Sequence, residues 1–157
     1  MLEIGQKAPR ANVKFTTKDV VNQPYNLGEA YDQGTTVLYF FPAAFTGVCT
    51  KSSCELRDDI SEFSALEASI YGISVDMPFS QKLFITQNDI NYPILSDWNR
   101  EAIESFDIVD NAFAGNLRGV ARRAVFVIKD GVVTYSWTGE HPGIYPPFDE
   151  VKANLKT

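Results

Sequence analysis

This chain contains little of what metal centres, disulfide scaffolds and membrane spans require. Its 157 residues include two cysteines and a single histidine. Two cysteines do not make the disulfide framework of a small secreted protein, and with one histidine they leave the ligand set of a structural zinc site incomplete. The longest apolar runs fall far short of the roughly 20 residues that a transmembrane helix needs. We therefore expect no metal, no cofactor and no membrane partner.

Positive charge is also scarce. There are 14 lysines and arginines against 20 aspartates and glutamates, which gives a net charge of −6. No dense basic run is present to neutralise phosphates, so we expect no nucleic-acid partner. The N-terminus lacks the basic and then apolar segment of a secretory signal, which favours a cytoplasmic, thiol-reducing location. In that setting a close cysteine pair is more often catalytic or metal-binding than structural.

The chain is long and apolar enough for one globular domain over residues 1–157, because 45% of its residues are hydrophobic. The periodicity predicts strands at 35–41, 69–76, 92–97, 123–128 and 132–138, and helices at 49–67, 80–89, 99–108 and 148–156. Residues 4–27 indicate a short N-terminal hairpin, and Asp130-Gly131 indicates the turn between the last two strands. This order predicts a mixed α/β sandwich.

Both cysteines lie in one short stretch, FFPAAFTGVCTKSSC, at residues 40–54. Cys49 falls where the expected strand gives way to the expected helix. A thiol is a good nucleophile only as the thiolate, and the free N–H groups and dipole of a helix's first turn favour that anion. Thr46 can place a hydroxyl nearby, and Gly47 lets the backbone approach a ligand closely. The alternative is that Cys49 is a buried cysteine that packs as a small apolar side chain.

The spacing Pro42-x-x-x-Thr46-x-x-Cys49 resembles the active-site signature of the peroxiredoxins, which are thiol peroxidases of thioredoxin-like fold. The segments ISVD (73–76), YPILSD (92–97) and RAVFVIKDG (123–131) look like family segments in family order, so the resemblance covers roughly residues 3–155. It implies a central mixed β-sheet flanked by helices, with an N-terminal β-hairpin.

The resemblance also implies a role for each matching residue. Cys49 matches the cysteine whose thiolate attacks the O–O bond of hydrogen peroxide or an organic hydroperoxide. Thr46 matches the hydroxyl that hydrogen-bonds the thiolate and the peroxide, and Pro42 matches the residue that shields the pocket from water. Arg123 matches the arginine that stabilises the thiolate and orients the peroxide. Because a strand alternates faces, only one of Arg122 and Arg123 is expected to point at the site, and we choose Arg123.

Cys54 admits two interpretations. In the bacterioferritin-comigratory (Q-type) branch, a second cysteine five residues on resolves the sulfenic acid as an intramolecular disulfide, which thioredoxin or a similar reductant recycles. In an intact helix the two Cα atoms would lie about 8.7 Å apart, beyond the roughly 4.4–6.8 Å of a disulfide, so the helix would have to open. FFPAAFTGVC instead looks like the AhpE-like branch with its many one-cysteine members. Cys54 would then be a helix residue only, and an external thiol would resolve Cys49.

Two other functional classes stay open at this point. A thioredoxin-type dithiol oxidoreductase is disfavoured, because the spacing is Cys-x-x-x-x-Cys and no proline directly precedes RAVFVI. A redox sensor would use the same cysteine switch without turnover. The expected partners of the peroxidase are a hydroperoxide and either a thioredoxin-like protein or a low-molecular-weight thiol. Both a monomer and a homodimer are compatible with the sequence.

Overall fold

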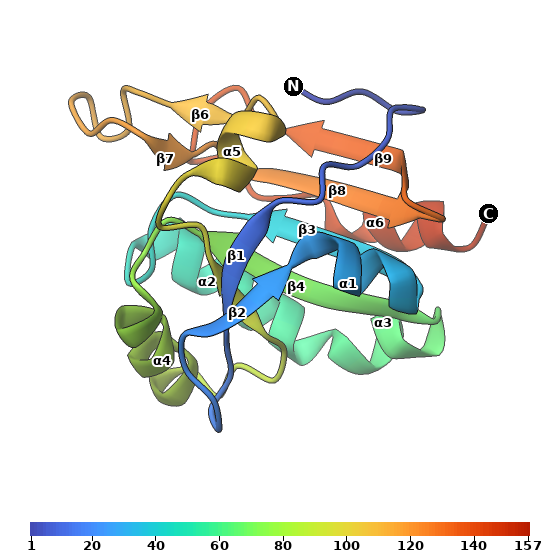
Figure 1. Cartoon of the computed structure of the whole chain (residues 1–157), viewed down its shortest axis with the longest axis horizontal. Coiled ribbons are helices and arrows are strands. Elements are labelled where there is room, and N and C mark those ends of the chain that lie inside the picture. Colours follow the sequence, from blue (N-terminus) through green and yellow to red (C-terminus); the bar gives the residue numbers. More distant parts are fainter.

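A seven-stranded β-sheet forms the centre of the computed structural model, which describes residues 1–157 (Figure 1). Its strands are β1 (Asn12–Thr16), β2 (Gln23–Asn26), β3 (Thr35–Phe40), β4 (Ala68–Ser74), β5 (Ile94–Ser96), β8 (Ala124–Lys129) and β9 (Val132–Thr138). They lie in the order β2-β1-β5-β4-β3-β8-β9. β4 pairs in parallel with both β3 and β5, and every other neighbouring pair is antiparallel. The sheet is therefore mixed, and β1 and β2 form the expected N-terminal hairpin.

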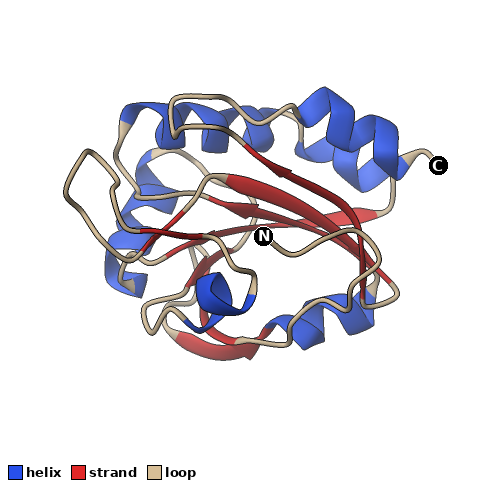
Figure 2. Cartoon of the chain, turned by 90° about the horizontal axis from the view of Figure 1, so that it is seen from above, coloured by secondary structure: helices blue, strands red, loops and turns tan.

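Helices cover both faces of this sheet (Figure 2). The helices are α1 (Leu27–Gln33), α2 (Gly47–Asp58), α3 (Ile60–Ala65), α4 (Pro78–Gln87), α5 (Glu101–Ser105) and α6 (Phe148–Leu155). A separate small ribbon pairs β6 (Val109–Asp110) with β7 (Val120–Ala121). None of the helices is both long enough and apolar enough to span a bilayer.

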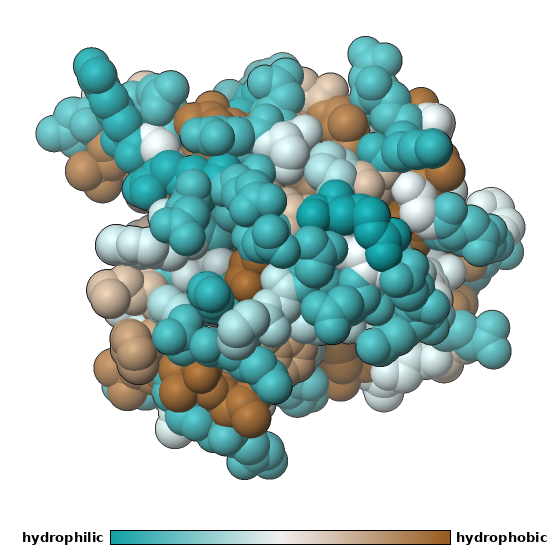
Figure 3. Space-filling model, viewed as in Figure 1, coloured by the Kyte–Doolittle hydropathy of each residue, from teal (hydrophilic) through white to brown (hydrophobic).

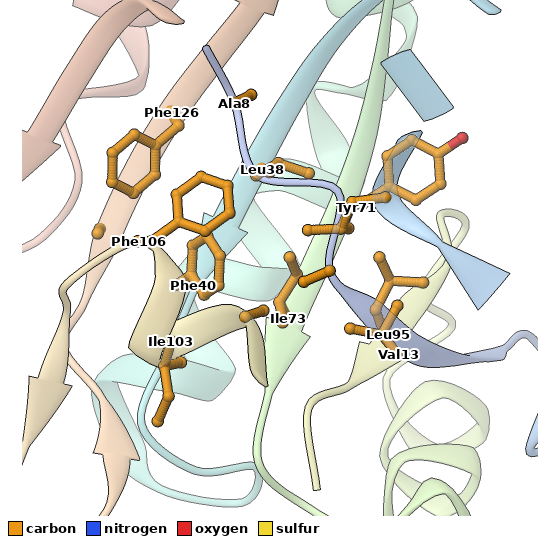
Figure 4. Packing of buried hydrophobic residues seen from close by; sticks show 14 of the residues in the cluster. Ala8, Val13, Leu38, Phe40, Tyr71, Ile73, Leu95, Ile103, Phe106 and Phe126 are labelled. Atoms are coloured by element: carbon orange, nitrogen blue, oxygen red, sulfur yellow. The ribbon is translucent and has the colours of Figure 1, made fainter. Parts of the chain in front are cut away.

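The alternation of side chains along β3 divides the core into two clusters. Leu38 and Phe40 join a cluster of 21 buried residues that also includes side chains from α1 and α5, which we call the α1-face cluster (Figure 4). Tyr39 joins a cluster of 17 buried residues that includes side chains from α2, α3, α4 and α6, which we call the α2-face cluster. Cys49 belongs to the α2-face cluster. β3 thus contributes buried side chains to both clusters, including the one that contains Cys49.

The outer surface in one view is mostly hydrophilic, with apolar side chains gathered where α4 lies (Figure 3). Met77, Phe79 and Leu83 are among the exposed large hydrophobic residues of this region. α4 is nonetheless anchored from its other side, where Phe84 and Ile85 are buried in the α2-face cluster.

Two parts of the sequence prediction differ from the structure. The single helix expected at 49–67 is two helices, because the backbone leaves helical geometry at Asp59, which ends α2 and precedes α3. Helix α1 was not expected at all. Its signal is present as a capping box, in which the Asn26 side chain accepts from the helix start and Glu29 accepts from the Asn26 backbone. The hairpin turn at Asp130-Gly131 is confirmed, and both residues have positive φ (53° and 76°).

Candidate active site

Cys49 lies at the start of α2, on the side of the helix that faces the sheet. β3 ends at Phe40, the buried Pro42 follows, and Thr46 is the N-cap residue of the helix. Cys49 is therefore the third helical residue, within the first turn, where backbone N–H groups have no partner inside the helix. Its exposed fraction is 0%.

Arg123, just before β8, points its guanidinium directly at the sulfur. The distance from Nη2 to the Cys49 Sγ is 3.2 Å, Nη1 donates to the Tyr39 hydroxyl at 2.7 Å, and Nε donates to the Pro142 carbonyl at 3.1 Å. Arg123 is only 3% exposed. Burial alone would lower the pKa of Arg123, but the interactions with Tyr39 and Cys49 outweigh it and raise that pKa. The guanidinium is therefore a fixed positive charge beside the sulfur.

Arg122 occupies a different environment from its neighbour. Its side chain is half-buried, and no side-chain hydrogen bond joins it to Cys49 or Tyr39, although both arginines line the same open hollow. Its backbone N–H donates to the Ile108 carbonyl at 2.8 Å. The structure thus brings Arg123, and not Arg122, into contact with Cys49.

Thr46 lies one turn from Cys49, but its hydroxyl is directed at the loop. The Thr46 Oγ donates to the Ala43 carbonyl at 2.8 Å. A hydroxyl has one proton to donate, so the hydrogen bond expected from Thr46 to the sulfur is not formed in this state. The Thr46 oxygen keeps lone pairs that can accept from a ligand.

The loop between β3 and α2 is tied down by Asp76. One carboxylate oxygen accepts from the Ala44 backbone N–H at 2.8 Å and from the Ser74 hydroxyl at 2.7 Å. Phe45 has a φ of 68°, and its ring packs edge-on against Phe84 with centroids 5.4 Å apart. A non-glycine residue in this region of φ is strained, so packing and hydrogen bonding must hold the loop in place. Cys49 itself has no exposed surface, so the loop and the first turn of α2 enclose the sulfur.

Cys54 lies on another side of the same helix. It is half-buried, and its thiol lies 3.8 Å from the Asn88 side-chain oxygen. Cys54 also lines an open groove with Lys51 and Tyr145. Both cysteines are free, and α2 continues unbroken from Gly47 to Asp58. In ideal helix geometry the side chains of residues five apart point about 140° away from each other, so the two sulfurs are not placed to bond in this state.

Tyr39 is a site residue that the sequence reasoning missed. It is fully buried, and burial raises its pKa well above the ordinary value of a tyrosine. The available signal was a hydroxyl within the otherwise apolar run VLYFF, because a buried phenol needs a hydrogen-bond partner. The partner could not be named, because Arg123 is distant in the sequence.

The chain is similar to known proteins over most of its length, and the matched range includes Pro42, Thr46, Cys49 and Arg123. Residues 4–136 match the model of the AhpC/TSA family. Alkyl hydroperoxide reductase E of Mycobacterium tuberculosis is 33% identical over 138 residues, which cover 87% of this chain and 85% of that protein. A chloroplastic 2-cysteine peroxiredoxin of Chattonella marina var. antiqua is 33% identical over 147 residues, with 86% and 70% covered.

A solved structure of similar sequence has the same fold. The crystal structure of peroxidoxin BcpB from Mycobacterium tuberculosis superposes with a TM-score of 0.84 at 29% identity, and the match covers 99% of this chain and 97% of that one. This agreement confirms the thioredoxin-like arrangement of a mixed sheet flanked by helices. The family match covers most of the chain, and it includes the buried cysteine of the first helical turn and the arginine that contacts its sulfur. The chain belongs to the AhpC/TSA family, the peroxiredoxins.

Proposed function

We propose that this chain reduces hydrogen peroxide and organic hydroperoxides through a sulfenic acid at Cys49. The observation that carries the proposal is the 3.2 Å contact between the Arg123 guanidinium and the Cys49 sulfur in a buried site. A buried cation is unfavourable unless it is paired, and the sulfur is the group beside it that can become an anion. Arg123 therefore favours the nucleophilic thiolate.

The reaction needs few parts. The thiolate attacks the terminal oxygen of the peroxide, an S–O bond forms, and the O–O bond breaks. The sulfur is oxidised to a sulfenic acid, and the leaving oxygen takes a proton to become an alcohol or water. Charge moves from sulfur onto both oxygens in the transition state, and Arg123 and the N–H groups of the first turn of α2 would act there as donors. Thr46 can accept from the peroxide proton, and Pro42 helps to keep water out.

The direct test is single-turnover oxidation followed by intact mass. Wild-type protein mixed with one equivalent of hydrogen peroxide should consume the peroxide, and Cys49→Ser should consume none. Cys54→Ser is the matched control, because it removes the other thiol and should still react with one peroxide. A Cys49→Ser protein that reduces peroxide as fast as wild type would refute the proposal.

For resolution, we propose that Cys54 attacks the sulfenic acid, forming a disulfide and releasing water. This step requires α2 to open, and a weak point lies between the two thiols. The Ser53 hydroxyl is buried without a hydrogen-bond partner, and the Ser52 hydroxyl bonds back to the Val48 carbonyl at 2.6 Å. An unpaired buried hydroxyl costs about 1–3 kcal/mol, which opening of the helix would return.

Ser53→Ala tests this resolution step separately from the oxidation step. Alanine removes the unpaired hydroxyl and is a better helix former, so the closed helix is stabilised. We expect disulfide formation to slow several-fold while oxidation of Cys49 keeps its rate, with exposed Ser61→Ala as the control. If wild type and Cys54→Ser both accumulate a stable sulfenic acid, Cys54 does not resolve and an external thiol takes that role.

The remaining features of the proposal concern partners and setting. The reductant is a thioredoxin-like protein or a low-molecular-weight thiol, which would reach Cys54 through its open groove. The chain acts as one domain over residues 1–157 in the cytoplasm. Monomer and homodimer are both compatible with this mechanism, and sedimentation equilibrium distinguishes them. Reduction of insulin disulfides without peroxide consumption would instead favour a dithiol oxidoreductase.

A further inference from the structure

Tyr39 carries a fully buried hydroxyl between two apolar residues on the same side of the sheet. These neighbours are Val37, in β3, and Phe41, directly after it, and all three residues belong to the α2-face cluster. The hydroxyl lies 2.7 Å from Nη1 of Arg123. We propose that Tyr39 is a positioning residue that holds the Arg123 guanidinium in the orientation that contacts the Cys49 sulfur. The inference rests on the proposed peroxidase function and adds to it a residue that acts through Arg123.

The geometry of the guanidinium makes this assignment specific. A guanidinium is a planar group whose N–H donors have fixed directions. Here its three nitrogens each have one partner, the Pro142 carbonyl, the Tyr39 hydroxyl and the Cys49 sulfur. The Pro142 carbonyl and the Tyr39 hydroxyl together define the plane of the group and its rotation, so the third donor is aimed at the sulfur. Without the phenol, the group could turn about its bond to the Pro142 carbonyl.

Tyr39 is itself held rigidly. β3 lies between β4 and β8, so its backbone is hydrogen-bonded on both sides. The Tyr39 ring stacks on Phe41 with centroids 5.5 Å apart and meets Phe148 edge-on at 5.8 Å. A hydroxyl on such a ring is a fixed point, whereas the arginine side chain has several rotatable bonds. The rigid partner therefore sets the position of the flexible one.

The chemical nature of Tyr39 suits this role better than a carboxylate would. Burial keeps the phenol in its neutral form, because it raises the pKa of Tyr39 far above neutrality. A neutral oxygen accepts a hydrogen bond from the guanidinium and leaves its positive charge uncompensated. A carboxylate at the same place would neutralise that charge. Tyr39 thus orients Arg123 while the full charge stays available to the sulfur.

Tyr39→Phe tests the inference, because it removes one oxygen and keeps the ring. Tyr92→Phe is the matched control, since Tyr92 is also buried and its hydroxyl donates to the Ser53 carbonyl of the same helix at 2.8 Å, away from Arg123. Both changes are made in a Cys54→Ser background so that Cys49 is the one reacting thiol. The readouts are the rate of Cys49 oxidation by hydrogen peroxide and the pH profile of Cys49 alkylation by iodoacetamide.

We expect Tyr39→Phe to slow oxidation by roughly tenfold or more and to move the alkylation profile to higher pH, because a hydrogen bond to a charged group is lost. Tyr92→Phe should leave both readouts unchanged, although it should change thermal stability about as much as Tyr39→Phe does. In an Arg123→Lys background, Tyr39→Phe should have no further effect, because the two residues act as a unit. If Tyr39→Phe does not fold, 3-fluorotyrosine at position 39 weakens the acceptor with the hydroxyl kept, and it should shift both readouts in the same direction.

The outcomes separate this inference from the proposed function. If the parent protein consumes peroxide and Tyr39→Phe matches Tyr92→Phe in rate and in pH profile, the positioning role is overturned and the peroxidase function stands. If the parent protein does not consume peroxide, the proposed function fails. The alkylation profiles then still show whether Tyr39 acts on Cys49 through Arg123.

Discussion

The two faces of the central sheet are built from alternate residues of the same strands, yet they differ in what they bury. The α1-face cluster is held mainly by apolar packing, and the rings of Phe40, Phe106 and Phe126 pack at its centre with centroids 4.9–5.8 Å apart (Figure 4). The α2-face cluster surrounds the polar group formed by Tyr39, Arg123 and Cys49.

The difference separates two demands on one fold. Apolar packing stabilises without directionality, whereas a buried polar group stabilises only when every partner is in place. Substitutions on the α1 face should therefore change stability, and substitutions around Arg123 should change reactivity. Each prediction below tests this division.

The largest expected effect comes from Phe40→Ala on the α1 face. Removal of a fully buried phenyl ring leaves a cavity and should lower the free energy of unfolding by about 3–5 kcal/mol, as measured in urea. Phe79→Ala, at a residue 59% exposed, is the control and should change it by less than about 1 kcal/mol. Below the unfolding transition, Phe40→Ala should reduce peroxide at nearly the wild-type rate. A loss of activity in the fully folded variant would contradict the division between the faces.

The second prediction concerns the neighbouring arginines. Arg123→Lys should slow peroxide reduction by about 100-fold, roughly 2.7 kcal/mol, because one ammonium cannot contact Tyr39, Pro142 and Cys49 together. Arg122→Lys should stay within about threefold of wild type, since Arg122 does not contact the sulfur. Equal effects of the two changes in stopped-flow measurements would remove the role assigned to Arg123.

The third prediction uses the one strongly shifted carboxyl on the α1 side. Burial raises the pKa of Asp97 to about 6, although the backbone N–H groups of Ala102 and Ile103 donate to it. Because the folded pKa lies above the unfolded one, this group's contribution to stability is complete below about pH 4 and is lost as the pH rises through 6. Wild type should lose on the order of 2–3 kcal/mol relative to Asp97→Asn between pH 4 and 7. If the free energy of unfolding of the two proteins changes equally with pH across this range, the pKa of Asp97 is not raised.

The smallest effect is expected from the tether of the active-site loop. Asp76→Ala removes the acceptor of the Ala44 N–H and of the Ser74 hydroxyl, so the loop that carries Thr46 should become less ordered. We expect peroxide reduction to slow by about threefold to tenfold, with little change in thermal stability. Asp19→Ala, at an exposed turn, is the control. A faster reaction in Asp76→Ala would mean that the tether limits access to Cys49 more than it orders the site.

Local sequence patterns predicted the strand and the helix that carry the site. They could not predict contacts between residues that are far apart in the sequence. The apolar run before Pro42 and the helical spacing after Thr46 placed Cys49 in a first helical turn, and the resemblance supplied Arg123. The link from Tyr39 to Arg123 depends on the pairing of β3 with β8, which periodicity does not encode. The break at Asp59 was missed for a related reason, because the helical spacing of apolar residues continues across it.

The pairing of one buried guanidinium with one sulfur has a consequence for the reacted protein. A sulfenic acid is neutral, so oxidation of Cys49 by the proposed chemistry would leave Arg123 enclosed without its counter-charge, at a cost of several kcal/mol. The first turn of α2 would then be least stable immediately after peroxide has been consumed. The reaction with peroxide would thereby favour unwinding of the first turn of α2, which must occur before a second thiol can attack the sulfenic acid.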